Sequence, residues 1–176
     1  MAENKEKWIL TYTGKKFFPL APKPEDICIE DIAHALALTC RYNGHSREFY
    51  SVAQHCVWMS MHCQGDKKWL LMHDAAEAYL SDVPRPIKPM LPEFRLIEDS
   101  VLAVIGGKYG IGEPDHESIK HADVVMLATE KRDVLLPCPD WPLILPDPLP
   151  FKITPWTWQV AEQLFLDRAK ELEVTK

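Results

Sequence analysis

Two adjacent polar residues, His73 and Asp74, stand inside an otherwise apolar run, WLLMHDAAEAYL. Burying an imidazole and a carboxylate in such a segment costs several kcal/mol unless a partner compensates. A divalent metal ion would compensate, because an imidazole nitrogen and a carboxylate oxygen together suit first-row transition metals. Glu77 follows one helical turn later on the same face, where it could hold a water beside the metal. The dyad and Glu77 therefore predict a metal centre.

Three residues from other parts of the chain could complete this centre. His55 stands among small and apolar residues in SVAQHC, Asp82 closes LSDVPRP just after the dyad, and Asp123 leads an apolar helical run in KHADVVML. An adjacent histidine and aspartate alone are weak grounds for function, since many core helices carry one satisfied histidine. Together with the dyad, the three additional residues could form a metal cage.

The order His55, His73-Asp74, Asp123 resembles the H…HD…D pattern of the HD-domain metal-dependent phosphohydrolases. The stretch HDAAEAYLSDVPRPIK is especially similar to the branch that contains bacterial 5′-deoxynucleotidases. In that branch the HD pair is followed by Glu three residues on, Asp five further, and a Pro-X-Pro turn. The resemblance therefore implies an all-α fold and hydrolysis of nucleotides.

The resemblance extends from about Ile29 to Leu135 and, more loosely, over the proline-rich opening. The opening looks like a subgroup of small HD proteins from bacteria and phages. Some phage relatives are similar to deoxynucleoside triphosphate hydrolases, including dATP-directed ones. The interval from His55 to His73 is shorter than in the deoxynucleotidase branch, which leaves the identity of the substrate open.

Carried over by position, the resemblance implies four metal ligands: His55, His73, Asp74 and Asp123. It gives Glu77 the role of positioning or deprotonating the attacking water, and Asp82 that of orienting the water or the sugar. Arg41 falls where the deoxynucleotidases have a phosphate-binding arginine, and Tyr42 where they have a tryptophan beside the nucleoside. Lys88 is a second candidate cation for the phosphate, although a solvated loop lysine would look the same.

The chemistry of these residues agrees with the resemblance. Phosphate ester hydrolysis needs an activated water and neutralisation of charge on phosphoryl oxygens, and one divalent ion can provide both. The mixed nitrogen and oxygen ligands predict Co, Mn, Fe, Ni or Zn, with Mg also compatible. The leading hypothesis is a 5′-deoxynucleotidase that releases phosphate from deoxynucleoside monophosphates. Two alternatives stay open: a dATP-type triphosphohydrolase and a metal- or nucleotide-binding module without turnover.

The remaining histidines are weaker candidates as ligands. His34 and His62 are expected to pack in the core or at the surface, and His121 lies on a different helical face from Asp123. His45 and Arg47 occupy the turn before the second helix, where they could close over the site or face solvent. Tyr79 and the Phe17-Phe18 pair could stack on a base, but burial is favoured, and three tryptophans are expected to anchor the arms: Trp141, Trp156 and Trp158.

Composition limits the class of protein. The 176 residues carry 47% hydrophobic and 26% charged side chains, which suits one soluble globular domain. A net charge of −6 argues against electrostatic binding of extended nucleic acid over a broad surface. No apolar run is long enough to span a membrane, and the N-terminus MAENKEKW lacks the core of a secretion signal, so we expect a cytoplasmic protein. The oligomeric state is left open, a homodimer included.

The elements that must position the site are predominantly helical. Helices are expected over 29–41, 51–63, 69–80, 93–110, 115–135 and 156–173, because apolar residues recur there at helical spacing. Prolines exclude a helix from 83–92. The fold class predicted is a single-domain all-α bundle with four parts: an extended or hairpin arm (1–28), an HD core (29–135), a proline-rich crossing (136–155) and a C-terminal helix (156–176). The five cysteines are expected to be reduced core residues.

Overall fold

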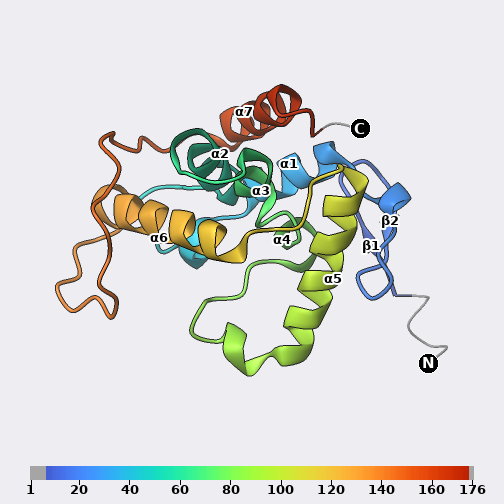
Figure 1. The fold of residues 1–176 in the computed structure, drawn as a ribbon, viewed down its shortest axis with the longest axis horizontal. Coiled ribbons are helices and arrows are strands. Elements are labelled where there is room, and N and C mark those ends of the chain that lie inside the picture. The colour runs from blue at the N-terminus through green and yellow to red at the C-terminus, as the bar shows by residue number, and fades with distance from the viewer. Residues whose placement is uncertain (1–6, 175–176) are drawn as a thin grey trace.

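A computed structural model describes residues 7–174. The first six residues of the predicted arm, which include most of the MAENKEKW stretch, and residues 175 and 176 lie outside the described part. Most of the described chain is helical, which confirms the all-α class (Figure 1). The helices are α1 (Ile29–Leu38), α2 (Val52–His62), α3 (Lys67–Met72), α4 (Glu77–Leu80), α5 (Pro92–Lys108), α6 (His116–Asp133) and α7 (Trp158–Glu171).

The N-terminal arm forms a small hairpin. Strand β1 (Ile9–Leu10) pairs antiparallel with β2 (Lys16–Phe17), with Ile9 opposite Phe17. The turn between them uses Gly14 at a φ of +84°, a conformation that glycine adopts without strain. Phe17 is fully buried and stacks on Tyr79, so the hairpin is fixed to the helical core. The predicted burial of Tyr79 and Phe17 is confirmed.

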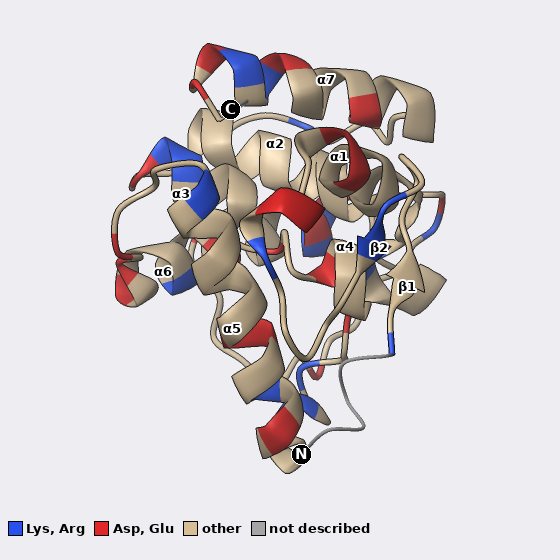
Figure 2. Cartoon of the chain, turned by 90° about the vertical axis from the view of Figure 1, so that its right-hand side faces the viewer, with Lys and Arg blue, Asp and Glu red and all other residues tan. Residues whose placement is uncertain are grey.

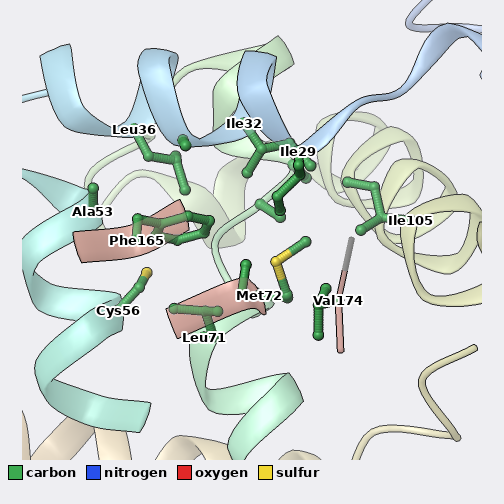
Figure 3. Packing of buried hydrophobic residues seen from close by; sticks show 14 of the residues in the cluster. Ile29, Ile32, Leu36, Ala53, Cys56, Leu71, Met72, Ile105, Phe165 and Val174 are labelled. Carbon is green, nitrogen blue, oxygen red and sulfur yellow. The ribbon is translucent and has the colours of Figure 1, made fainter. Parts of the chain in front are cut away.

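Side chains of several helices form the main hydrophobic core. Helix α1 packs against α7, α2 and α4, and α2 also packs against α3 and α7. Leu36, Ala53 and Phe165 are among the fully buried residues shared by these helices (Figure 3). A second cluster joins α2 and α3 to α6 through Met59, Leu70 and other apolar residues. Helix α6 is thereby held against α2, which carries His55, and against α3, which ends just before His73 (Figure 1).

The predicted helix over 69–80 is wrong in its middle. Helix α3 ends at Met72, α4 begins at Glu77, and the residues between them form turns. Backbone bonds there span three residues, as from the N–H of Ala75 to the carbonyl of Met72 at 2.9 Å. The His73 Nδ1 lies 3.2 Å from the carbonyl oxygen of Leu70, the group that a continuing α-helix would use for Asp74. The dyad therefore sits on an interrupted helix.

The predicted first helix is too long. Helix α1 ends at Leu38, and Thr39 is extended, with its hydroxyl donating to the Ala35 carbonyl at 2.8 Å. The N–H of Arg41 donates to the carbonyl of Tyr50 at 2.8 Å, which brings the chain back toward α2. Arg41 therefore begins a separate short 3-10 turn, Arg41–Gly44, and does not close α1 as expected.

The proline-rich crossing is extended and runs from the end of α6 to α7, as predicted (Figure 1). All five cysteines are free, but only Cys56 and Cys63 are buried; Cys28 and Cys40 are half-buried and Cys138 is exposed. The core assignment is therefore wrong for those three. Lys and Arg lie among Asp and Glu along α7 (Figure 2). Within residues 7–174, no helix has both the length and the apolar character needed to cross a membrane.

Candidate metal centre

The structure brings the four predicted metal ligands to one place. His55 comes from α2, His73 and Asp74 from the turn after α3, and Asp123 from α6. His55 Nε2 lies 3.6 Å from Asp123 Oδ1 and 4.0 Å from Asp74 Oδ2. His73 Nε2 lies 3.2 Å from Asp74 Oδ2. One donor atom from each of His55, His73 and Asp123 falls within 4.8 Å of the others, a spacing that could hold a metal ion.

The residues present fit a divalent cation. His55 is fully buried, and its Nε2 has no hydrogen-bond partner although it faces two carboxylates. A buried ring nitrogen without a partner is costly, and a cation between it and the carboxylates would remove that cost. Burial alone would raise the pKa of Asp74, but His73, His55 and Arg41 lower it well below the usual value. The Asp74 carboxyl group therefore favours the ionised form.

Glu130 is a functional residue that the sequence reasoning missed. It is fully buried on α6, and its Oε1 lies 2.6 Å from His55 Nδ1. The hydroxyls of Tyr42 and Tyr50 also donate to this carboxylate, that of Tyr50 at 2.9 Å. Burial would raise its pKa, but Arg41 and His55 hold it down at about 2, so Glu130 is ionised. Its position seven residues after Asp123 indicates the same helical face, but this spacing alone does not place it beside His55.

Arg41 lies among the carboxylates of the centre. Its guanidinium is 3.3 Å from Glu130, 3.6 Å from Asp74 and 3.7 Å from Asp123. The side chain is 15% exposed, and its buried Nε has no partner. Arg41 therefore neutralises part of the negative charge of the three carboxylates, and it also borders the cleft.

Glu77 and Asp82 border the same cleft as the ligands. Glu77 is only 9% exposed, and its Oε2 is buried without a hydrogen-bond partner. Burial, together with the carboxylates of Asp74 and Asp82, raises the pKa of Glu77 well above its ordinary value. A carboxyl group with a raised pKa is a stronger base when ionised than an ordinary glutamate, a property that catalytic carboxyl groups use.

A cleft of about 860 Å³ opens above these residues. One wall is the chain between α4 and α5, which contributes Asp82, Arg85 and Lys88. The Nζ of Lys88 lies 2.7 Å from Oε1 of Glu98, so the ammonium group of this predicted cation is paired with a carboxylate. Arg85, which sequence reasoning missed, donates to Asp123 and keeps 60% of its side chain exposed.

The other candidate residues are placed as follows. Tyr42 and His45 border the cleft, whereas Arg47 borders a neighbouring hollow of about 530 Å³. His34 pairs with Glu162 at 3.1 Å, and His62 packs against Trp58 and Phe151, so neither joins the centre. His121 is exposed. Trp156 and Trp158 pack against the main core as predicted, but Trp141 borders the cleft as well as packing against the second cluster.

Cys56 is a further neighbour of the dyad that the sequence did not single out for chemistry. Its Sγ lies 4.0 Å from Asp74 Oδ2, and it forms a second three-residue group with His73 and Asp74. Burial raises the pKa of this thiol to about 11. Because metals bind the thiolate, the carboxylates and imidazoles are the readier ligands at neutral pH.

Fold and site together define an α-helical protein with a partly buried cluster of histidines and carboxylates that borders a cleft. No family model matches the chain. It is 39% identical to the uncharacterized protein YfdR of Escherichia coli over 169 residues, which cover 94% of this chain and 95% of YfdR. The chain therefore belongs to the family of YfdR. It is also 30% identical to an uncharacterized protein of Rhodobacter capsulatus over 145 residues, 74% of each chain.

Proposed function

We propose that the protein is a metal-dependent phosphohydrolase of the HD-domain type that acts on nucleotides, releasing phosphate from deoxynucleoside 5′-monophosphates. The observation that carries this proposal is the buried, unpartnered Nε2 of His55, which faces the carboxylates of Asp74 and Asp123. The resemblance of HDAAEAYLSDVPRPIK to the 5′-deoxynucleotidases supports the choice of reaction. YfdR and the Rhodobacter capsulatus relative carry no described activity that bears on it.

The residues that would hold the cation are His55, His73, Asp74 and Asp123. A divalent ion in this place supplies a Lewis acid for phosphoryl oxygens and makes a water nucleophilic near neutral pH. Glu130 accepts a hydrogen bond from the Nδ1–H of His55. The opposite ring nitrogen, Nε2, therefore carries the lone pair that would bind the metal. Two histidines and two aspartates favour Co, Mn, Fe, Ni or Zn, with Mg also compatible.

Glu77 and Asp82, the two acidic residues beside the centre, deprotonate and orient the attacking water. Glu77, whose side chain borders the cleft, accepts the proton on its carboxylate. Asp82 borders the same cleft and orients the water or the deoxyribose hydroxyl. Glu77 then returns the proton to the leaving sugar oxygen as a general acid.

Cations on the cleft wall would hold the substrate phosphate. Arg41 and Arg85 border the cleft, and each is already paired with carboxylates of the centre. A planar guanidinium matches phosphate oxygens in a bidentate contact. Arg85 and Lys88 add two cations to Arg41 on the cleft wall, and this favours a triphosphohydrolase as the second candidate function.

The test uses purified full-length protein with Mn²⁺, Co²⁺ or Mg²⁺ and a panel of deoxynucleoside mono- and triphosphates. Release of orthophosphate from monophosphates supports the proposal. Release of tripolyphosphate from triphosphates supports the second candidate. Asp74→Ala should lose both metal and activity, whereas Asp99→Ala, an exposed acid on α5, should retain both. Metal binding and nucleotide binding without any turnover would instead identify a binding module and overturn the proposal.

A further inference from the structure

The cleft has a second, apolar part that the proposed hydrolysis does not use. Leu127 of α6 and the proline-rich crossing form it, the crossing contributing Cys138, Trp141, Pro142 and Leu143. In Figure 1 the crossing loops out beside the C-terminal part of α6, on the side of that helix where the chain between α4 and α5 also runs. The charged ligands and this apolar wall thus share one continuous cavity of about 860 Å³.

The spacing along α6 places the apolar wall next to the candidate metal centre. Leu127 follows Asp123 by one helical turn, which displaces it by about 6 Å along the helix axis toward the crossing. A 5′-nucleotide carries its planar base one sugar ring away from its phosphate. A phosphate held beside Asp123 would therefore leave the base within the part of the cleft bordered by Leu127 and Trp141.

Trp141 is held in place and has one unsatisfied group. Lys131 Nζ lies 5.1 Å from the centre of its ring, a distance typical of a cation–π contact. Lys131 borders the neighbouring hollow and not the cleft, so its charge supports the indole without occupying the space of a ligand. The indole Nε1 is buried and has no acceptor among residues 7–174. Because this nitrogen is buried, the ring itself and not its N–H is what Trp141 offers to a ligand in the cleft.

Tyr42 presents a second ring to the cleft. Its hydroxyl donates to Glu130, and its backbone adopts a φ of +56°, a left-handed conformation that is rare for a bulky residue. Such strain is retained where surrounding contacts fix the residue, and it clusters at functional sites. Tyr42 and Trp141 both pack against the second hydrophobic cluster, and this packing restrains the position of each ring at the edge of the cleft.

The crossing that carries Trp141 is tied to α6. The N–H of Leu149 donates to the Thr129 hydroxyl at 3.0 Å, and Arg132 donates to the carbonyls of Leu149 and Phe151. The N–H of Ile153 donates to Asp133 at 2.8 Å. These bonds fix the end of the crossing on α6, and Trp141 itself is held by its packing against the second hydrophobic cluster and by Lys131.

We propose that Trp141 is the stacking platform for the nucleobase of the substrate, which would lie against the face of the indole ring. The inference rests on the proposed function for the phosphate end of the ligand. Stacking is tolerant of base identity, because every base has a π-face. The platform therefore distinguishes a nucleotide from a bare sugar phosphate and discriminates weakly among the bases.

The experiment compares a deoxynucleoside 5′-monophosphate with 2-deoxyribose 5-phosphate, which has the same reacting group and no base. Wild type, Trp141→Phe, Trp141→Leu and Trp8→Leu are assayed with Mn²⁺. Trp8 is a matched control, since it is a half-exposed tryptophan on the N-terminal arm. In Trp141→Leu, the ratio of kcat/KM for nucleotide over sugar phosphate should fall about 10-fold, mainly through KM. The same ratio should fall by less in Trp141→Phe, and in Trp8→Leu it should equal the wild-type ratio.

A binding measurement separates this inference from the proposed function. Equilibrium dialysis of deoxynucleosides, which carry no phosphate, is performed on the same four proteins without added metal. Weaker binding by Trp141→Leu, about 10-fold, supports the platform even if wild type hydrolyses no phosphate ester. Equal nucleoside binding by wild type and both Trp141 variants overturns the inference, whether or not the protein is a phosphohydrolase. Thermal unfolding of each variant verifies that the comparison is made on folded protein.

Discussion

Glu130 and His55 form a fully buried pair in which a carboxylate oxygen lies 2.6 Å from the imidazole Nδ1. The pair comes from two helices, α6 and α2, that are joined by the second hydrophobic cluster. The contact fixes the rotation of the ring and directs Nε2 at Asp123 and Asp74. Carboxylates in this relation to a histidine commonly orient the ring and raise its basicity as a metal ligand.

Replacing Glu130 with Gln should weaken metal binding. The amide keeps the shape of the side chain but loses the charge that stabilises the Nδ1 proton of His55. Loss of such a supporting partner typically costs 10- to 100-fold in metal affinity. Titration with Zn²⁺ or Co²⁺ in the presence of a competing chelator measures the change. Glu117→Gln, an exposed acid on the same helix, is the control, and equal weakening in both variants would contradict the role of Glu130.

Sequence reasoning assigned the ligands His55, His73, Asp74 and Asp123, and the structure brings all four together. These residues belong to a linear pattern of types and spacing, so they could be found without a fold. Glu130 could not be assigned in that way, because its role depends on how α6 packs against α2. A helical reading would have placed Glu130 on the face of Asp123, but not beside His55.

The backbone conformation around the site also depends on tertiary contacts that the sequence pattern does not reveal. Periodicity predicts a continuous helix over 69–80, and it cannot detect that His73 competes for the carbonyl of Leu70. Arg41 was expected at a helix end, but the bridge between Cys40 and Ser51 turns the chain and buries the guanidinium among carboxylates. Trp141 was expected only as an anchor, since a proline-rich segment gives no periodic indication of the surface it faces.

Glu77→Gln should lose turnover while it keeps the metal. The substitution leaves an amide, which cannot take the proton of the attacking water as a carboxylate can. A general base usually contributes 10² or more to the rate, so kcat should fall by at least about 10². Phosphate release with Mn²⁺ and the metal content of each protein are measured together, with Glu93→Gln on α5 as the exposed control. Turnover near the wild-type rate would transfer the role to Asp82.

Arg41→Ala should destabilise the protein without metal. Arg41 is the cation shared by Asp74, Asp123 and Glu130, and removing it leaves these carboxylates without that compensation. Breaking a buried charge network in this way costs about 3 kcal/mol of unfolding free energy. Addition of Mn²⁺ should restore part of the loss, because metal binding favours the folded state. Urea unfolding with and without Mn²⁺ measures both effects.

Arg95→Ala is the matched control for Arg41→Ala, since Arg95 is an exposed arginine on α5. Its unfolding free energy should stay within about 0.5 kcal/mol of the wild type, as for most surface substitutions. An Arg41 variant as stable as Arg95→Ala would show that the guanidinium does not neutralise the centre. In that case its contribution would have to be sought in kcat/KM for the phosphate ester alone.

Asp133 should make the attachment of the proline-rich crossing depend on pH. Its carboxylate accepts the N–H of Ile153 at 2.8 Å and pairs with Arg132, and despite partial burial these contacts lower its pKa. A depressed folded-state pKa means that the stabilisation is present above the unfolded pKa, about 3.9, and is lost as pH falls through the folded pKa. Asp133→Asn should therefore be less stable than wild type at pH 7 by about 0.5–1.5 kcal/mol, with the difference closing below about pH 4. Urea unfolding at a series of pH values measures this, with the exposed Asp140→Asn as control. A gap between wild type and Asp133→Asn that stays constant from pH 7 to pH 3 would show that the charge of Asp133 contributes nothing to the attachment.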